Sequence, residues 1–238
     1  MPSSRARKIV KPGEPHEHHA SSGFCWSATY PDRAAALGQR KPKVIVASEG
    51  FDDMYIPVPV ARKLESSDSQ EPQSHAELMY VIRELGDTCA WERLVDMASR
   101  REYSSKEAED KLVRDGFSRD CARRAIEKAI TLRVIDDERF AGSFIRMKLS
   151  AGWGPVRIER ELAHRGVTLS DVAGWPEEFL DDESPEDRAF ELLERRRIPE
   201  KNPYQKLVRF LCSKGYPLSV CTSVVSDYLS RAREDGTC

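Results

Sequence analysis

The chain has 238 residues, a formal net charge of −2 and 33% charged side chains, and this length suits one or two domains. The near-neutral charge excludes binding to nucleic acid through bulk positive charge but leaves room for local basic patches. A mean hydropathy of −0.58 predicts that part of the chain lies outside a packed core. We expect no membrane segment, because no apolar run approaches about 18 residues and no signal-peptide core is present. Six cysteines, none spaced as C-x-x-C, indicate a reducing cytoplasm rather than a zinc site.

The first segment, residues 1–42, is rich in Pro, Ser, Ala, His and mixed charge without a sustained period. We therefore expect a mostly disordered N-terminal tail. His16, His18 and His19 flank Glu17, and these residue types can bind a metal ion. A flexible tail is the simpler interpretation of such a composition.

The next segment, residues 43–64, contains two short β-prone runs, VIV and MYI, separated by a turn-like SEGFDD. This pattern predicts a small β-hairpin. Pro57 restricts the second strand to an edge position or a short length. Residues 65–87 are expected to form a linker followed by a short helix that stops at Gly86.

An internal repeat is the strongest structural signal in the chain. Three glycines follow one another at intervals of 50 and 49 residues, each preceded by a leucine four positions earlier and followed by an apolar residue: Gly116, Gly166 and Gly215. We predict an all-α fold, an elongated array of three tandem three-helix repeats that stack to complete their cores. The expected repeats cover residues 88–134, 135–183 and 184–238. Gly174 and the Trp175-Pro176 pair interrupt the third helix of the middle repeat.

The middle repeat has clear helix boundaries. Asp136 is suited to cap the first helix, with Asp137 beside it at the positive end of the helix dipole. Pro155 is placed to begin the second helix and Gly166 to end it. The Asp136–Asp137 pair could also be imagined as a metal site, but capping is the better explanation of two acids at a helix start.

Basic residues recur at the end of the first predicted helix and along the second helix of each repeat. The simplest explanation is a solvated surface with ion pairs such as Glu161–Arg165. For the recurring set, we favour a surface that binds phosphates or an acidic protein groove. The candidate contact residues are Arg100, Arg101, Lys106, Lys111, Arg146, Lys148, Arg157, Arg160, Arg165, Arg195, Arg196, Lys206, Arg209 and Lys214.

No catalytic motif is present in the sequence. It contains no phosphate-binding loop, G-x-S-x-G elbow, H-E-x-x-H zinc motif or dinucleotide-binding glycine fingerprint. We therefore expect a protein that is not an enzyme and needs no cofactor or resident metal.

One long motif resembles a known family. The segment IDDERFAGSFIRMKLSAGWGPVRIERELAHRGV, from Ile135 to Val167, is similar to the central signature of the bacterial RecX family, the regulators of RecA recombinase. REYSSKEAEDKLVRDGF and KLVRFLCSKGY resemble the segments before and after it, so the likeness covers about residues 88–231. Arg165 replaces the more usual lysine, and the interruption near 170–183 departs from the pattern. Some relatives carry a small N-terminal β extension, which residues 43–60 resemble.

The resemblance implies a cytoplasmic protein that binds RecA–DNA filaments and inhibits RecA ATPase and strand exchange. Its expected role is to modulate homologous recombination, DNA repair and the SOS response. The expected partners are the RecA filament and single- or double-stranded DNA, without a membrane, and the expected state is a monomer. The alternatives are a stand-alone DNA-binding helical-repeat protein and a helical scaffold with a solubilising basic surface. Because Arg157, Arg160 and Arg165 are expected to face outward, reversing their charges should keep the fold and reduce RecA inhibition.

Overall fold

The computed structural model describes residues 13–31, 41–66, 71–180 and 184–234. They form two compact units, each described here by itself. The N-terminal unit comprises Met1–Glu102 with Glu107–Ile135, and the C-terminal unit comprises Tyr103–Lys106 with Asp136–Cys238. In the part of the chain that the structure describes, every helix is too short or too polar to cross a membrane.

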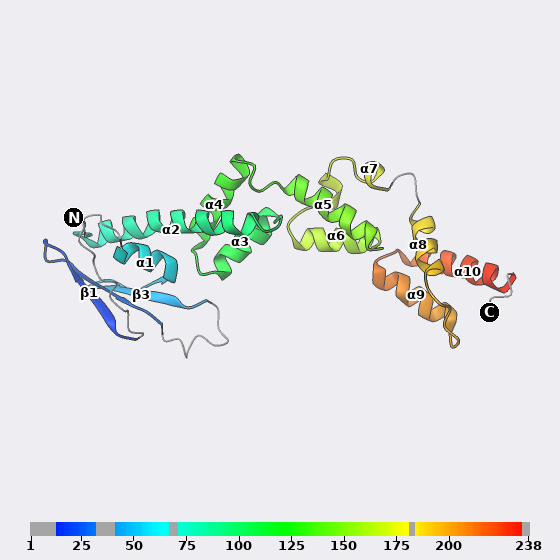
Figure 1. Cartoon of the computed structure of the whole chain (residues 1–238), viewed down its shortest axis with the longest axis horizontal. Helices are drawn as coiled ribbons and strands as arrows, with labels where there is room; N and C mark the ends of the chain where they lie inside the picture. The colour runs from blue at the N-terminus through cyan, green and yellow to red at the C-terminus, as the bar shows by residue number, and fades with distance from the viewer. Residues whose placement is uncertain (1–12, 32–40, 67–70, 181–183, 235–238) are drawn as a thin grey trace, which may run out of the picture. The chain divides into compact units, whose positions relative to one another are not determined.

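A four-stranded antiparallel sheet opens the N-terminal unit (Figure 1). Its strands follow one another in chain order: β1 (Pro15–His19), β2 (Cys25–Thr29), β3 (Lys43–Ser48) and β4 (Met54–Pro57). The predicted hairpin is confirmed as β3 and β4, and β4 is an edge strand that ends at Pro57. Most of the described chain is helical, as predicted, but residues 15–29, which we expected to belong to a mostly disordered tail, form two strands instead. Residues 1–12 and 32–40 of that expected tail lie outside the described residues.

Burial explains why these strands form. Trp26 and Ala28 of β2 alternate with more exposed neighbours, as do Val44 and Val46 of β3, and all four side chains are buried. This period of two places one apolar face of the sheet toward the core. Strand β1 could not be predicted from its polar sequence. It is an edge strand, and its His18 ring stacks on Trp26 with the ring centroids 4.0 Å apart.

The histidines of β1 contact a carboxylate from the following helix. Glu65 accepts a hydrogen bond from the Tyr30 hydroxyl at 2.6 Å and lies 3.2 Å from Nδ1 of His16. Burial and this hydrogen bond raise the pKa of Tyr30. The expected flexible tail is therefore replaced by a packed polar cluster, and no group of potential metal ligands is found among the described residues.

The helices of the N-terminal unit pack beside the sheet, with α1 between the sheet and α2 (Figure 1). They are α1 (Val58–Ser66), α2 (His75–Ala98), α3 (Ser105–Arg114) and α4 (Arg119–Thr131). Residues 103–106, which include the first two residues of α3, belong to the C-terminal unit. The predicted helix end at Gly86 is wrong, because α2 continues through it. A Cβ atom at this glycine would lie 3.1 Å from Sγ of Cys121, so the residue serves close packing of α4 on α2. Part of the predicted linker, residues 67–70, lies outside the described residues.

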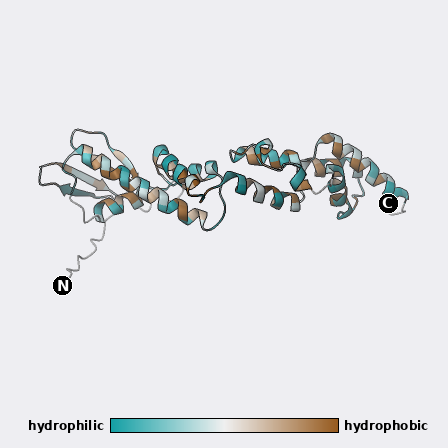
Figure 2. Ribbon diagram, turned by 90° about the horizontal axis from the view of Figure 1, so that it is seen from above, coloured by the Kyte–Doolittle hydropathy of each residue, from teal (hydrophilic) through white to brown (hydrophobic). Residues whose placement is uncertain are grey.

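The C-terminal unit is helical throughout its described part. Its elements are α5 (Asp137–Ser150), α6 (Pro155–His164), the 3₁₀ turn η1 (Leu169–Asp171), α7 (Glu177–Leu180), α8 (Pro185–Glu194), α9 (Pro203–Lys214) and α10 (Leu218–Glu234). The predicted cap at Asp136 is confirmed, since its carboxylate accepts a hydrogen bond from the Arg139 amide at 3.0 Å. At the start of α8, Ser184 forms a capping box with Asp187. Figure 2 shows hydrophobic residues interspersed with hydrophilic ones along these ribbons, as expected for amphipathic helices.

The interrupted part of the middle repeat still completes a core. Leu169 of η1, Val172 directly after it and Phe179 of α7 are buried together with Phe144 and Ile145 of α5. Two short elements therefore replace the third helix that the repeat pattern leads one to expect. The division of the chain into three repeats with the boundaries given above stays a prediction.

The three repeated glycines end their helices in the same way. Each has a positive φ, of 104° at Gly116, 79° at Gly166 and 93° at Gly215. The amide after each glycine donates to the carbonyl of the leucine four residues before it: Phe117 to Leu112, Val167 to Leu162 and Tyr216 to Leu211. These bonds define a Schellman C-cap, and the three leucines are fully buried. We call residues 112–117, 162–167 and 211–216 the glycine turns.

The first glycine turn contains a buried carboxylate. The side chain of Asp115 is 5% exposed and lies 2.7 Å from Nε of Arg93, 3.0 Å from Nζ of Lys41 and 3.9 Å from Nζ of Lys111. Burial alone would raise the pKa of Asp115, but hydrogen bonds and charge from Lys41 and Arg93 hold it below its ordinary value of 3.8. The ionised carboxylate thus links the end of α3 to Arg93 of α2 and to Lys41, just before β3.

The depressed pKa of Asp115 predicts a pH-dependent contribution to stability. A carboxylate with a lowered folded-state pKa stabilises the fold above its unfolded pKa of about 3.9 and loses this effect as the pH falls through the folded value. We expect Asp115→Asn to lower the free energy of unfolding by roughly 2 kcal/mol at pH 7. The difference from the parent protein should shrink below about pH 4. Urea denaturation followed by circular dichroism between acid and neutral pH measures both values.

The control for this prediction is Asp110→Asn, because Asp110 is an exposed acid on the same helix. It should leave the unfolding free energy nearly unchanged at every pH. Equal effects of the two substitutions would contradict the role assigned to Asp115.

Candidate binding surface on the C-terminal unit

The predicted contact residues of the N-terminal unit already have acidic neighbours. Arg100 pairs with Asp96 at 2.6 Å, Arg101 with Glu107 at 3.3 Å and Lys111 with Asp115 at 3.9 Å. The surface pairs of Arg100 and Arg101 contribute little to stability, but all three acids neutralise their cations locally. The basic character of this unit is therefore weaker than its sequence suggests.

Trp153 lies between two of the predicted contact residues in the C-terminal unit. The Arg157 guanidinium stacks over its ring at 3.7 Å from the ring centroid, and Nζ of Lys148 lies 4.6 Å from the same centroid. Nη1 of Arg157 also donates to the Ser213 carbonyl at 3.1 Å. Both cations are half-buried, so the indole fixes their positions on the surface through cation–π contacts.

Arg165 is held in a similar way. Its guanidinium lies 5.0 Å from the Phe144 ring centroid and donates to the Glu161 carboxylate at 2.7 Å. The hydrogen bond from Arg165 holds the pKa of Glu161 below its ordinary value of 4.5. Arg157 and Arg165 therefore do not simply face outward as expected, and reversing their charges would also disturb the local structure.

Further cations rest on aromatic rings. Arg146 lies over Phe179 at 4.9 Å, and Arg196 and Lys214 lie over Phe210 at 4.3 and 5.9 Å. In contrast, Arg195 is paired with Glu191 at 3.0 Å. Stacking keeps the charge of a cation available to a partner, whereas pairing with a carboxylate neutralises it.

Apart from Lys106, three of the predicted residues are exposed and form neither an ion pair nor an aromatic contact among the described residues. Arg160 of α6 and both Lys206 and Arg209 of α9 are exposed and form no ion pair within the described ranges. Lys106 differs from them, because its side chain packs against the glycine turn at Gly166. A Cβ atom added to Gly166 would lie 2.9 Å from the Cβ atom of Lys106. The side chains of Arg160, Lys206 and Arg209 are therefore held by neither a carboxylate nor an aromatic ring in the described part of the chain.

Aligning the glycine turns relates these cations to one another. With the offset of 49 residues between Gly166 and Gly215, Arg157 corresponds to Lys206, Arg160 to Arg209 and Arg165 to Lys214. With the offset of 50 residues to Gly116, the same positions hold acids: Glu107, Asp110 and Asp115. The glycine spacing could have predicted this contrast from the sequence. It places the repeated basic positions on α6 and α9 and leaves their counterparts on α3 acidic.

Two glycine turns hold the start of another helix in the C-terminal unit. The Gly154 amide donates to the Lys214 carbonyl at 2.9 Å, and the Val156 amide donates to the Gly215 carbonyl at 3.2 Å. At the corresponding position one repeat earlier, the Ser104 hydroxyl donates to the Arg165 carbonyl at 2.7 Å. The carbonyl groups left free at one helix end thus accept hydrogen bonds from the start of another.

The contact at Gly154 requires the absence of a side chain. A Cβ atom there would lie 2.5 Å from the Gly215 carbonyl oxygen and 2.7 Å from the Tyr216 nitrogen. Both are backbone atoms that cannot move without breaking the junction between α6 and α9. This junction fixes the basic positions of α6 relative to those of α9.

Comparisons with known proteins converge on one family. A family model described as "RecX, second three-helix domain" matches residues 136–173, which contain α5, α6 and η1. A curated relative named "Regulatory protein RecX" from Clostridium perfringens is 35% identical over 129 residues, which cover 51% of this chain and 60% of that protein. The chain thus spans less than two thirds of that relative. A relative of the same name from Xanthomonas campestris pv. campestris is 34% identical over 130 residues, covering 52% of this chain and 78% of that protein.

A solved structure titled "Crystal structure of regulatory protein RecX" is also similar to this chain. It is 19% identical, with a TM-score of 0.49, and the match covers 79% of this chain and 95% of the other. A likeness at this level adds nothing to the family assignment, which rests on the sequence relatives.

The junction between α6 and α9 predicts opposite effects of two glycine substitutions. Gly154→Ala forces backbone atoms apart and should lower the free energy of unfolding by roughly 2 kcal/mol. Gly142→Ala should not lower it, because Gly142 lies inside α5 and an added Cβ meets the flexible end of Arg146 at 3.3 Å and only touches the Phe179 ring, at 4.0 Å. Alanine there also favours the helix by about 1 kcal/mol. Thermal denaturation of both variants checks the pair, and equal stability would contradict the steric role of Gly154.

Proposed function

Because the chain belongs to the RecX family of regulatory proteins, we propose that it binds filaments of RecA recombinase on DNA and restrains them. The family is regulatory rather than enzymatic. In this proposal the protein inhibits RecA ATPase and strand exchange, and thereby modulates homologous recombination, DNA repair and the SOS response. It acts in the cytoplasm as a monomer.

The repeated cations of α6 and α9 carry the proposal. Arg160 and Arg209 occupy equivalent positions one repeat apart, and both are exposed and form no ion pair in the described part of the chain. A filament presents the same surface at regular intervals, so a binder with charges repeated at corresponding positions can contact successive intervals. The acidic groups available in such a filament are DNA phosphates and carboxylates of the protein subunits.

The stacked cations support the same surface. Arg157 and Lys148 on Trp153 and Arg165 on Phe144 lose little conformational entropy on binding, because the rings already order them. We propose that these residues, with the other predicted basic positions of the C-terminal unit, surround the contact made by Arg160 and Arg209.

The second candidate function is stand-alone binding to DNA. The cation–aromatic pairs favour it, because aromatic rings and arginine planes stack on unpaired bases. The net charge of −2 argues against it, since affinity for DNA alone comes mainly from phosphate contacts and falls steeply with salt. We therefore expect weak, salt-sensitive binding to bare DNA and tighter binding to RecA–DNA filaments.

A double charge reversal tests the proposed surface. Arg160→Glu with Arg209→Glu should keep the fold, because both side chains are exposed, and should raise the concentration needed for half-inhibition of RecA ATPase about tenfold or more. The measurement is RecA ATPase and strand exchange at increasing protein concentration, with circular dichroism as the check on folding.

The matched control is Arg62→Glu with Arg233→Glu, which makes the same change in net charge at two other exposed positions. Inhibition by this control should equal that of the parent protein. If the parent protein leaves RecA ATPase and strand exchange unchanged at near-equimolar amounts, the proposed function is wrong. If Arg160→Glu/Arg209→Glu inhibits fully, the function stands but the surface lies elsewhere.

A further inference from the structure

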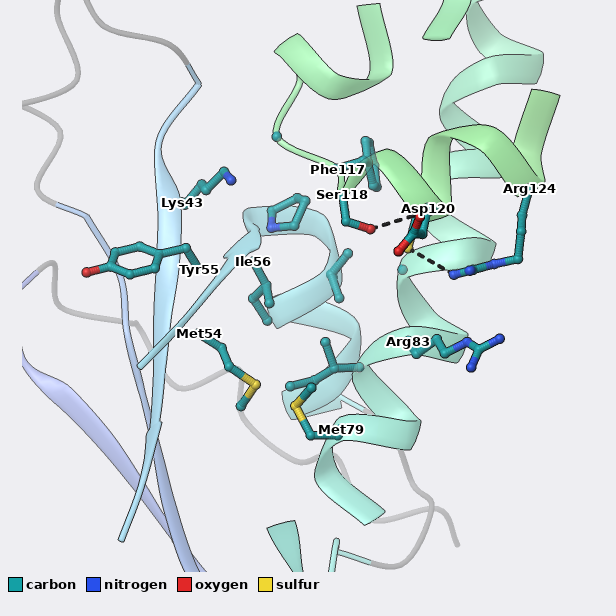
Figure 3. Close-up of a pocket in the computed structure, with 16 residues that line it drawn as sticks. Lys43, Met54, Tyr55, Ile56, Met79, Arg83, Phe117, Ser118, Asp120 and Arg124 are labelled. Atoms are coloured by element: carbon teal, nitrogen blue, oxygen red, sulfur yellow. Dashed lines mark hydrogen bonds between the residues drawn. The ribbon is translucent and has the colours of Figure 1, made fainter. Parts of the chain in front are cut away.

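The N-terminal unit contains an apolar pocket of about 530 Å³ outside the basic surface. It lies between the edge strand β4, the first half of α2 and the first turn of α4 (Figure 3). Its apolar wall includes Met54, Ile56, Met79, Ile82 and Phe117. A volume of this size fits a few large side chains or a small ligand.

Strand alternation and two glycines create the pocket. Met54 and Ile56 point from β4 toward the helices, whereas Tyr55 between them points away (Figure 3). Gly86 of α2 and Gly116 of the first glycine turn contribute backbone but no side chain to the lining. The pocket is therefore a product of the same sequence features that pack α4 on α2 and end α3.

Methionine is prominent in the wall, and one of the two methionines is accessible. Met79 is 44% exposed and faces Met54 across the opening (Figure 3). Methionine side chains adapt to partners of different shape and are enriched at protein–protein interfaces. An exposed apolar side chain beside an open apolar pocket indicates a surface that a partner covers.

The rim of the pocket carries more positive than negative charge. Lys43, Arg83 and Arg124 line it against one acid, Asp120. Arg124 is bound to Asp87 through contacts of 2.8 and 2.7 Å. Lys43 and Arg83 form no ion pair within the described residues, so their charges are available to a ligand on either side of the apolar wall.

We propose that this pocket docks an acidic polypeptide segment of the partner protein, which inserts one or two large apolar side chains. The apolar wall binds the inserted side chains, and Lys43 and Arg83 pair with flanking carboxylates. This inference rests on the proposed function, so the segment belongs to the RecA protein of the filament. The pocket then provides a protein contact that is separate from the basic surface of α6 and α9.

The surroundings of the pocket favour polypeptide over DNA. The wall is built mainly of aliphatic and methionine side chains, whereas single-stranded nucleic acid binds on aromatic faces with several nearby cations. Helix α3, which leads into the adjacent glycine turn, carries Glu107 and Asp110 at positions that are basic in α6 and α9, and Asp115 of the turn takes the third such position. This unit therefore lacks the repeated basic positions that would attract DNA phosphates.

Site-specific photo-crosslinking of the full chain tests the docking. Benzoylphenylalanine replaces Met79 in one variant and Val156 in another, since Val156 is 50% exposed in the first turn of the basic helix α6. Each variant is irradiated with RecA filaments on single-stranded DNA, and the crosslinked products are identified by mass spectrometry. We expect the probe at Met79 to crosslink to RecA at an apolar residue with acidic neighbours.

The two probes separate the possible outcomes. Crosslinks from position 156 to RecA or DNA, with none from position 79 to RecA, would overturn the docking proposal and leave the proposed function intact. Crosslinks from position 79 only to DNA or to a second copy of this chain would also overturn it. No crosslink from either position would contradict the proposed function as well.

A charge substitution provides an independent readout. Arg83→Glu should weaken binding to RecA filaments about fivefold or more in a sedimentation assay, since it opposes the acidic segment. Arg62→Glu, another exposed arginine of the N-terminal unit, should leave binding unchanged. Equal affinities of the two variants would remove the proposed electrostatic contact, and circular dichroism establishes that both are folded.

Discussion

The glycine turn is the interaction on which the described helices depend most. At Gly116, Gly166 and Gly215 the backbone enters the left-handed region, which glycine adopts without steric cost. The bond from the following amide then closes the helix over a fully buried leucine. In two of the three places the closed end also accepts a hydrogen bond from the start of another helix. One local backbone conformation thus ends a helix, anchors its core and positions its neighbour.

The sequence predicted the features whose causes are local. Asp136 and Pro155 mark helix starts through hydrogen bonding and ring geometry within one turn, and helices begin there in the structure. The repeated glycines were likewise recognisable because their requirement for positive φ does not depend on distant residues. The contact residues stay a prediction, but the glycine register already contained the contrast between acidic α3 and basic α6 and α9.

Features with non-local causes could not be predicted in this way. Strand β1 is polar along its length, and it is ordered by pairing with β2 and by contacts of its histidines with Trp26 and Glu65. Gly86 gives the same local signal as a helix end, but α2 continues through it. The glycine lacks a side chain there because Sγ of Cys121 in α4 packs against its backbone. The stacking of Arg157 on Trp153 and its bond to Ser213 also join residues whose proximity no sequence spacing reveals.

The first glycine turn has a different neighbour from the other two. Gly116 faces Lys43 and Pro57 of the sheet, and Asp115 is bound by Lys41. A chain in which every such turn could receive the start of a further helix would carry complementary ends, and complementary ends that do not close into a ring generate open-ended polymers. Because Lys43 of β3 and Pro57 of β4 lie against the first turn, the N-terminal sheet occupies the place that the start of another helix takes at the other two turns.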